Sequence, residues 1–195
     1  MSRVIAIEHL TLDGVMQAPG HPEEDLRDGF PHGGWAASRG QDPVMQEMMG
    51  ARMSSAWSLL AGRTTYERFA EYWPRQEPNP FTEALNRVQK YVASTTLAEP
   101  LAWQNSTLLR GDAGDAVARL KQDVEENLVV FGSGVLVRSL MARGLVDEFV
   151  LMLHPLVLGA GRRLFPDSGT RLSDFRLAES ATTGTGVIMA VYQAT

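Results

Sequence analysis

The stretch NLVVFGSGVLVRSL, residues 127–140, decides which fold the sequence predicts. Residues 128–131 form a short, continuous apolar run, which is typical of a strand buried on both faces of a sheet. The Gly-Ser-Gly turn at 132–134 follows directly, and apolar residues then recur at helical spacing until Gly144, a natural helix end. A strand, a turn with almost no side chains and a helix start leave backbone N–H groups at the positive end of a helix, which suits a phosphate or diphosphate.

The same turn also has a simpler interpretation. A tight connection between a strand and a helix can require glycine for its backbone angles alone. The turn differs from the Rossmann dinucleotide motif, which needs a third small residue where Val137 stands and an acidic residue about twenty positions on, where Met152 stands. Taken alone, the turn is therefore weak support for a bound dinucleotide.

The composition favours an ordinary globular protein and excludes several classes of site. A chain of 195 residues is most simply one domain, residues 1–195, with a sizeable core. The net charge of −5 and the lack of a Lys/Arg cluster argue against nucleic acid and against an anionic membrane as partners. Without cysteine there are no disulfides, zinc–thiolate sites or thiol nucleophiles, and no metal site is expected. The N-terminus has no signal-like segment, so a cytoplasmic protein is expected.

Predicted strands and helices alternate along most of the chain, which is typical of an α/β fold. Helices are expected after Asp42, after Gly62, after Asn79 and over 115–122, and the last two strands are expected to form an antiparallel hairpin through 182–185. The sequence therefore predicts a mostly parallel sheet with an antiparallel C-terminal end. The expected strands are 4–7, 57–61, 90–93, 107–109, 128–131, 147–158 with a bend near Pro155, 175–181 and 186–193.

Small and hydroxyl-bearing residues follow three of the predicted strands, at 62–65, 94–96 and 132–134. In an open parallel sheet the ligand crevice lies outside the carboxyl ends of the strands, so these segments are expected along one edge. Arg63 supplies a planar guanidinium for phosphate, and the neighbouring threonines add neutral donors. The alternative is that Arg63 pairs with Glu67 on the surface while threonine caps the helix, an arrangement that is common and weak.

Residues 17–42 form a long irregular stretch rich in proline and glycine, which in a compact domain is usually a functional lid or disordered. Trp35 within it could cap a pocket or could pin the stretch to the core. The helix after it carries methionines on one face, which could line an adaptable pocket but are more simply a core stripe. These methionines are Met45, Met48, Met49 and Met53.

Four motifs follow one another along nearly the whole chain. They are TLDG at 11–14, GRTTYE at 62–67, VFGSG at 130–134, and DE at 147–148 followed by HPLVLGAG at 154–161 and LF at 164–165. In this order and spacing they resemble the dihydrofolate reductase-like superfamily, and most closely the riboflavin-biosynthesis reductase domain, which is the C-terminal domain of RibD. The resemblance implies a dihydrofolate reductase-like, three-layer α/β/α fold.

The resemblance further implies that NADPH binds across the sheet edge. Arg63 and Thr64, with Ser94 and Thr95, would hold the 2′-phosphate and the diphosphate, while residues 12–15 would lie near the nicotinamide. The cofactor-binding residues expected on this basis are Leu12, Gly14, Val15, Gly62, Arg63, Thr64, Thr65, Ser94, Thr95, Gly132, Ser133, Gly134, Val135 and Leu136. The expected substrate-binding residues are Trp35, Leu158, Gly159 and Gly161.

The expected reaction is hydride transfer from NADPH to a C=N or C=O group of a small heterocyclic substrate, pyrimidine-like or pterin-like. Such a reduction needs a proton donor, and Asp13, Glu47 and His154 are the candidates. Each also has a simpler interpretation, as a turn residue, an exposed helix residue and a core histidine respectively. Dihydrofolate reductases place an acid where Gln46 and Glu47 fall, but no surrounding motif fixes the register here.

Two other functions stay open on the sequence. The chain could be a non-catalytic module that binds NADP(H) or another small molecule, because no residue is clearly the proton donor. It could also be a flavin reductase, although only generic apolar residues suggest an isoalloxazine pocket. Relatives in the superfamily are commonly dimers, which implies a homodimer.

Overall fold

The computed structural model describes residues 2–40, 42–166 and 173–195. The chain divides into two compact units, each of them discontinuous in sequence. Unit 1 comprises the residues up to Ala6 together with Ser55–Val146, and unit 2 comprises Ile7–Ser54 and Asp147–Thr195. Strand β1 (Val4–Thr11) runs from unit 1 into unit 2. That a single domain covers residues 1–195 stays a prediction.

The strands of unit 1 follow the order β4-β3-β2-β5-β1. The β2–β3, β3–β4 and β2–β5 pairs are all parallel, as predicted. Gly62 is level with Ala93, and Ala93 is level with Leu109, so the residues that follow three of the strands share one edge. The bounds are β2 Trp57–Gly62, β3 Lys90–Ala93, β4 Ser106–Leu109 and β5 Asn127–Phe131.

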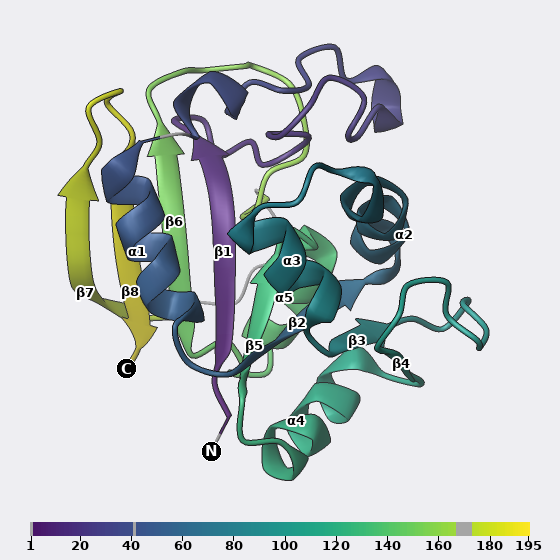
Figure 1. The fold of residues 1–195 in the computed structure, drawn as a ribbon. Coiled ribbons are helices and arrows are strands. Elements are labelled where there is room, and N and C mark those ends of the chain that lie inside the picture. The colour runs from purple at the N-terminus through teal and green to yellow at the C-terminus, as the bar shows by residue number, and fades with distance from the viewer. Residues whose placement is uncertain (1, 41, 167–172) are drawn as a thin grey trace. The chain divides into compact units, whose positions relative to one another are not determined.

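Four helices of unit 1 alternate with these strands. Helix α2 contacts β2 and β3, α5 contacts β2, and α4 contacts both β4 and α5. In Figure 1, α3 lies in front of the strands of unit 1 and α5 lies behind them. The bounds are α2 Arg63–Tyr72, α3 Pro80–Arg87, α4 Ala113–Asp123 and α5 Gly134–Met141, and the short 3-10 helix η3 is Trp73–Arg75.

Side-chain caps explain where two of these helices begin. Asn79 accepts hydrogen bonds from the N–H groups of Phe81 and Thr82, and the Thr82 hydroxyl accepts one from the N–H of Asn79, which makes a capping box. Asp112 caps α4 by accepting from the N–H of Asp115 at 3.0 Å. Helices α2 and α5 have no side-chain cap, so their first N–H groups lack the usual acceptor.

The strands of unit 2 follow the order β1-β6-β8-β7, and Figure 1 shows helix α1 in front of them. β6 pairs with β8 and β7 pairs with β8, both antiparallel, which confirms the predicted C-terminal hairpin and the predicted mixed α/β sheet. The predicted strand 147–158 ends at His154, because Pro155 has no N–H for the ladder. The bounds are β6 Glu148–His154, β7 Phe175–Thr182 and β8 Ile188–Ala194.

Helix α1 (Pro43–Met53) begins where the sequence predicts. The Asp42 carboxylate accepts a hydrogen bond from the N–H of Val44 at 2.9 Å, and proline occupies the first helical position. Met45 and Met48 are buried, which favours the core-stripe interpretation of the methionines.

The predicted lid is irregular over residues 17–40, with two short 3-10 helices, η1 (Arg27–Gly29) and η2 (Ala37–Arg39). Its residue Gln41 lies outside the described residues.

Glu8 is a buried acidic residue in the middle of β1. It is 2% exposed, and its Oε1 atom has no hydrogen-bond partner among the described residues. Burial raises the pKa of Glu8 well above its ordinary value of 4.5, because a carboxylate without partners is poorly solvated in the core. Glu8 is therefore a neutral carboxylic acid in the folded chain at pH values where the unfolded chain carries it ionised.

The substitution Glu8→Gln should make stability less sensitive to rising pH. Above pH 4.5 the unfolded wild type releases the proton that the folded state retains, so ionisation favours unfolding as the pH rises. The free energy of unfolding of Glu8→Gln minus that of wild type should grow by up to about 1.4 kcal/mol per pH unit between pH 5 and the raised pKa. Urea unfolding at pH 5, 6 and 7 measures this difference, and identical pH profiles would contradict it.

Candidate functional site

Two strand-to-helix turns of unit 1 are joined by one hydrogen bond. The N–H of Gly62, at the end of β2, donates to Oγ of Ser133, the residue before α5, over 3.0 Å. The Ser133 hydroxyl therefore serves the neighbouring turn and does not cap α5, its own helix. The bond holds the starts of α2 and α5 together at one edge of the sheet.

The turn before α5 has an unusual backbone. Gly132 has a φ of 68° and Ser133 a φ of 59°, so two consecutive residues are left-handed. Glycine adopts this conformation freely, whereas serine there carries a strain of order 1 kcal/mol. Strain of this kind persists only where the surroundings impose it, and here the hydrogen bond from Gly62 holds Ser133 in place. Val135, in the first turn of α5, is 67% exposed, so the uncapped helix start faces accessible space.

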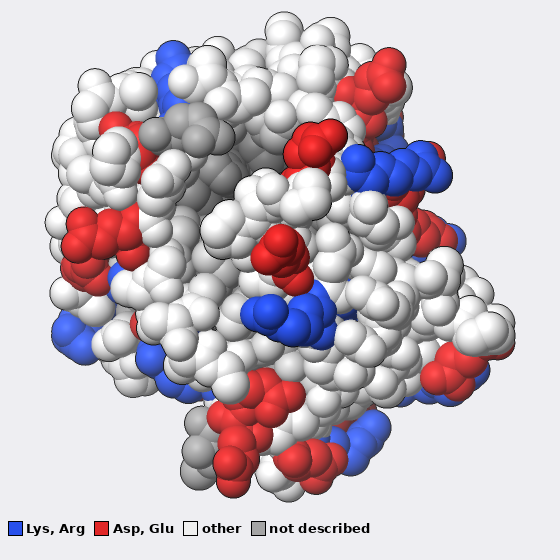
Figure 2. All heavy atoms as spheres, in the orientation of Figure 1, with Lys and Arg blue, Asp and Glu red and all other residues white. Residues whose placement is uncertain are grey.

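Arg63, the first residue of α2, is exposed and makes no ion pair with any described residue. The predicted alternative, an Arg63–Glu67 pair with a threonine cap, is therefore wrong, because the structure contains neither the pair nor the cap. Other arginines do pair with carboxylates, for example Arg143 with Asp112 at 2.8 Å. On the face drawn in Figure 2, many basic side chains likewise stand beside acidic ones. An unpaired guanidinium next to an uncapped helix start is suited to an anion.

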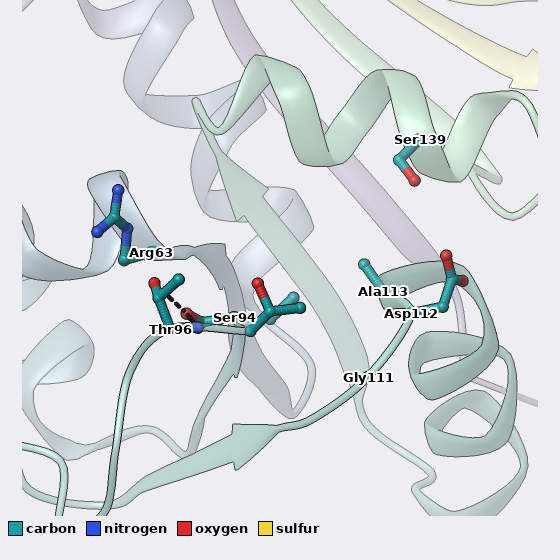
Figure 3. A pocket seen from close by; sticks show the side chains of 9 residues that line it. Arg63, Ser94, Thr96, Gly111, Asp112, Ala113 and Ser139 are labelled. Carbon is teal, nitrogen blue, oxygen red and sulfur yellow. Dashed lines mark hydrogen bonds between the residues drawn. The ribbon is translucent and has the colours of Figure 1, made fainter.

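A pocket of roughly 420 Å³ lies at this edge of unit 1. In Figure 3, Arg63 stands at one end of it near Ser94 and Thr96, and Asp112 and Ser139 stand at the other end. The Ser94 hydroxyl accepts hydrogen bonds from the N–H groups of Thr96 at 3.1 Å and of Leu97 at 3.0 Å, which shapes the turn after β3. The lining residues are Arg63, Ala93, Ser94, Thr95, Thr96, Gly111, Asp112, Ala113 and Ser139.

In unit 2, Asp13 fastens two loops together. Its carboxylate accepts hydrogen bonds from the Thr11 hydroxyl at 2.5 Å, from the N–H of Gly159 at 2.9 Å and from the N–H of Leu158 at 3.2 Å. The Thr11 hydroxyl, followed by the two N–H groups, lowers the pKa of Asp13, because each bond favours the ionised form. Asp13 is thus a carboxylate at neutral pH, and the exposed Leu12 beside it lies on the surface of unit 2.

An apolar cluster joins the lid to the loop that contains Leu158. Val15, Ala18 and Phe30 are buried together, and Trp35 and Leu158 pack against them. The indole N–H of Trp35 donates to the carbonyl oxygen of Gln17, also in the lid, at 2.7 Å. The Trp35 ring packs against the cluster and meets His154 of β6 edge-on, so Trp35 pins the lid to the rest of unit 2.

Gly161 approaches this cluster so closely that a larger residue would clash. A methyl group at Gly161 would lie 2.7 Å from both Phe30 and Val15, and its φ is 119°. The loop containing the expected substrate residues is therefore packed closely against the lid.

Two histidines of unit 2 form a hydrogen-bonded pair. Nδ1 of His9 and Nε2 of His154 are 2.9 Å apart, and the ring of Trp35 meets that of His154 edge-on with 5.1 Å between centroids. His154 is fully buried. Burial, aided by the charge of Arg39, lowers the pKa of His154 to about 4, and burial, aided by the charge on His154, lowers the pKa of His9 to about 3. Both rings are neutral at neutral pH.

Glu47, the third predicted proton donor, is exposed on α1. No ion pair or hydrogen bond joins it to Asp13 or to His154, whereas Asp13 and His154 each contact residues of the predicted substrate loop or the lid.

A family model for the RibD C-terminal domain matches residues 3–189. The chain belongs to the RibD C-terminal domain family. Among relatives of this RibD C-terminal domain, the uncharacterised protein YyaP of Bacillus subtilis (strain 168) is 30% identical over 140 residues, which cover 69% of this chain and 72% of YyaP. The uncharacterised protein YwjB of the same organism is 29% identical over 113 residues, which cover 55% of this chain and 58% of YwjB.

Solved structures share the fold of this RibD C-terminal domain. A protein of Shewanella sp. PV-4 that is assigned to riboflavin biosynthesis by name only superimposes with a TM-score of 0.75 at 19% identity, over 99% of each chain. A pyrimidine reductase-like protein of Corynebacterium diphtheriae has a TM-score of 0.67 at 11% identity, over 100% of this chain and 92% of its own. Dihydrofolate reductase of Enterococcus faecalis, complexed with NADP(H), has a TM-score of 0.62 at 13% identity, over 99% of this chain and 96% of its own. These likenesses confirm the predicted three-layer, dihydrofolate reductase-like α/β fold.

In this RibD C-terminal domain, unit 1 brings together expected cofactor residues from three separate strand ends. Gly62 bonds Ser133, Arg63 shares the pocket with Ser94 and Thr95, and a methyl at Gly132 would lie 4.0 Å from the Thr65 hydroxyl. Thr64, Gly134 and Leu136 belong to the same two helix starts. Leu12, Gly14 and Val15 belong to unit 2.

Several residues of these sites were not predicted, and three of them carry polar side chains. Asp112 and Ser139 line the pocket and His9 pairs with His154. Asp112 follows β4 just as Ser94 follows β3, so the rule about strand ends would have found it. No sequence signal identifies Ser139 or the pairing of His9.

Among the residues that the structure describes, no helix combines the length and apolar character needed to cross a membrane. Within the same residues, no group of three or more His, Cys, Asp or Glu side chains is placed to hold a metal ion.

Ser133→Ala should lower the free energy of unfolding by about 1 kcal/mol, because the N–H of Gly62 loses its acceptor. Ser139→Ala is the matched control: Ser139 lies on the same helix, is similarly half-buried and makes no side-chain hydrogen bond among the described residues. Its effect should stay within about 0.5 kcal/mol. Urea denaturation followed by circular dichroism measures both, and equal effects of the two substitutions would refute the role of the bond.

Proposed function

We propose that this RibD C-terminal domain protein is an NADPH-dependent reductase. It transfers a hydride to a C=N or C=O group of a small heterocyclic substrate, pyrimidine-like or pterin-like. The observation that carries the proposal is the pair of uncapped helix starts joined by the Gly62–Ser133 bond, with the unpaired Arg63 beside them. The solved neighbours named as a pyrimidine reductase-like protein and as a dihydrofolate reductase with NADP(H) support the reaction class and the cofactor.

The donor set of unit 1 fits the phosphates of NADPH. Two helix starts without side-chain caps offer backbone N–H groups and positive dipole ends to a diphosphate. The guanidinium of Arg63, with the hydroxyls of Thr64, Ser94 and Thr95, would hold the 2′-phosphate and the diphosphate. No other described group neutralises Arg63, so an incoming phosphate does not compete with an existing ion pair.

Unit 2 would handle the substrate in this proposal. NADPH, when bound, supplies the hydride. Asp13 holds the backbone of Leu158 and Gly159 in position, and Trp35 with Leu158 gives an apolar surface on which a flat heterocycle can pack. The chain would bind the cofactor and the substrate, orient them toward each other and exclude water from the reaction.

A non-catalytic NADP(H)-binding module is the second candidate. It is favoured by the state of the expected donors, since Asp13 is ionised and His154 is neutral and fully buried. A cytoplasmic homodimer, without nucleic acid, membrane or metal, stays part of the proposal. Steady oxidation of NADPH with a panel of pyrimidine, pterin and quinone substrates separates the two functions. Tight NADPH binding without turnover of any substrate favours the module.

Arg63→Ala should weaken NADPH binding about 10- to 100-fold, the loss expected for one charge-assisted hydrogen-bonded contact of about 1.5–3 kcal/mol. Binding of NADH should change much less, because NADH has no 2′-phosphate. Fluorescence titration with each nucleotide measures the two affinities.

The control for Arg63→Ala is Arg75→Ala. Arg75 is also an exposed arginine of unit 1, paired only loosely with Glu71 at 3.8 Å, and it does not line the pocket. Its removal should leave both affinities unchanged. An equal loss of NADPH and NADH affinity in Arg63→Ala would remove Arg63 from the 2′-phosphate site.

A further inference from the structure

The His9–His154 pair is the feature of unit 2 that the proposed function leaves unused. It brings two neutral imidazoles within 2.9 Å on neighbouring strands, β1 and β6. Trp35 packs edge-on against His154, and Trp35 in turn packs with Leu158 on the apolar cluster. The pair therefore lies beside the residues to which the substrate is assigned.

The buried end of the pair indicates which nitrogen carries each proton. Nδ1 of His154 is buried and has no hydrogen-bond partner among the described residues. If Nδ1 carried the proton, a buried N–H donor would be left without an acceptor, and such donors are rarer in native proteins than unpaired acceptors. The proton of His154 is thus on Nε2, which donates to Nδ1 of His9. His9, being neutral, then carries its own proton on Nε2.

The outer end of the pair is open. Nε2 of His9 makes no hydrogen bond with a described residue, and it is not among the buried unpartnered atoms. His9 is partly exposed whereas His154 is fully buried, so His9 is the member that a ligand can reach. The pair ends in one N–H donor of fixed direction.

We propose that the Nε2–H of His9 donates a hydrogen bond to the carbonyl oxygen or ring nitrogen of the heterocyclic ligand, and that His154 is the positioning residue that fixes its tautomer. The inference rests on the proposed function and adds to it a residue that touches the substrate. It replaces His154 as the contact, because a fully buried ring cannot meet a ligand.

The chemistry of a neutral imidazole suits this role. When a hydride adds to the carbon of C=N or C=O, the π electron pair moves to the nitrogen or oxygen, which becomes negatively charged and then takes one proton from solvent. An N–H directed at that atom stabilises the developing charge without giving up its own proton. The aligned pair holds the donor ready, so little reorganisation is needed during the reaction.

The first experiment observes the histidines directly by ¹⁵N-correlated NMR of the full chain with NADP⁺ present. Wild type should show His9 and His154 both as the Nε2–H tautomer. Addition of lumazine, a dioxopteridine with two carbonyl groups and ring C=N bonds, should shift the Nε2 resonance of His9. The resonance of His21 serves as the internal control and should stay in place.

Variants of His9 test the contact with the ligand, and a variant of His154 tests whether it positions His9. His9→Leu should weaken lumazine binding about tenfold, the equivalent of about 1.4 kcal/mol. His9→Gln keeps an N–H donor and should recover most of that loss. His154→Phe should leave His9 as a mixture of tautomers, which a merely structural role of His154 would not produce.

Kinetics tests the same residue in turnover. On any substrate of the panel that wild type reduces, His9→Leu should lower kcat/KM about 10- to 100-fold, and His9→Gln should restore most of it. An unchanged kcat/KM in His9→Leu would overturn the inference while leaving the reductase assignment intact. If wild type reduces no substrate, the reductase assignment fails and NMR decides the inference alone. A His9 resonance that does not move up to the solubility limit of lumazine overturns it.

Discussion

The hydrogen bond from Gly62 to Ser133 is the contact on which the candidate phosphate site depends. It takes the Ser133 hydroxyl away from its own helix, so α5 begins without a side-chain cap. It also holds Ser133 in a left-handed conformation that serine would not otherwise prefer. The result is two helix starts, both lacking caps, at one edge of a parallel sheet. The strained backbone of Ser133 is therefore part of a site that is complementary to an anion.

The residues proposed for the phosphate and those proposed for the heterocycle differ in charge. Unit 1 keeps Arg63 charged, exposed and unpaired at the end of its strands, where a phosphate can meet it. In unit 2, burial favours the neutral forms of Glu8, His9 and His154. Asp13 of the same unit is ionised, because three hydrogen bonds favour its carboxylate. Phosphate binding and heterocycle binding call for these two kinds of surface.

Much of this architecture was predictable because it depends on short-range rules. A buried apolar run followed by glycine and then by helical spacing predicted β5 and α5, and Asn79 and Asp42 predicted helix starts that their side-chain caps confirm. Placing 62–65, 94–96 and 132–134 at one edge followed from parallel pairing alone, since parallel strands end on the same side. The Arg63–Glu67 alternative failed because nothing in the sequence shows whether two neighbouring charges will meet.

The sequence by itself determined the elements, the family and the residue types available for a phosphate, because propensity, capping and periodicity act over a few neighbouring residues. Only the tertiary structure decided that Ser133 serves Gly62, 71 residues away, and that His9 meets His154, 145 residues away. It alone decided that Nδ1 of His154 is buried without a hydrogen-bond partner, whereas Nε2 of His9 is accessible. Hydrogen-bond partners and burial arise from contacts between distant segments, and no local pattern encodes which atoms those contacts will leave unpaired.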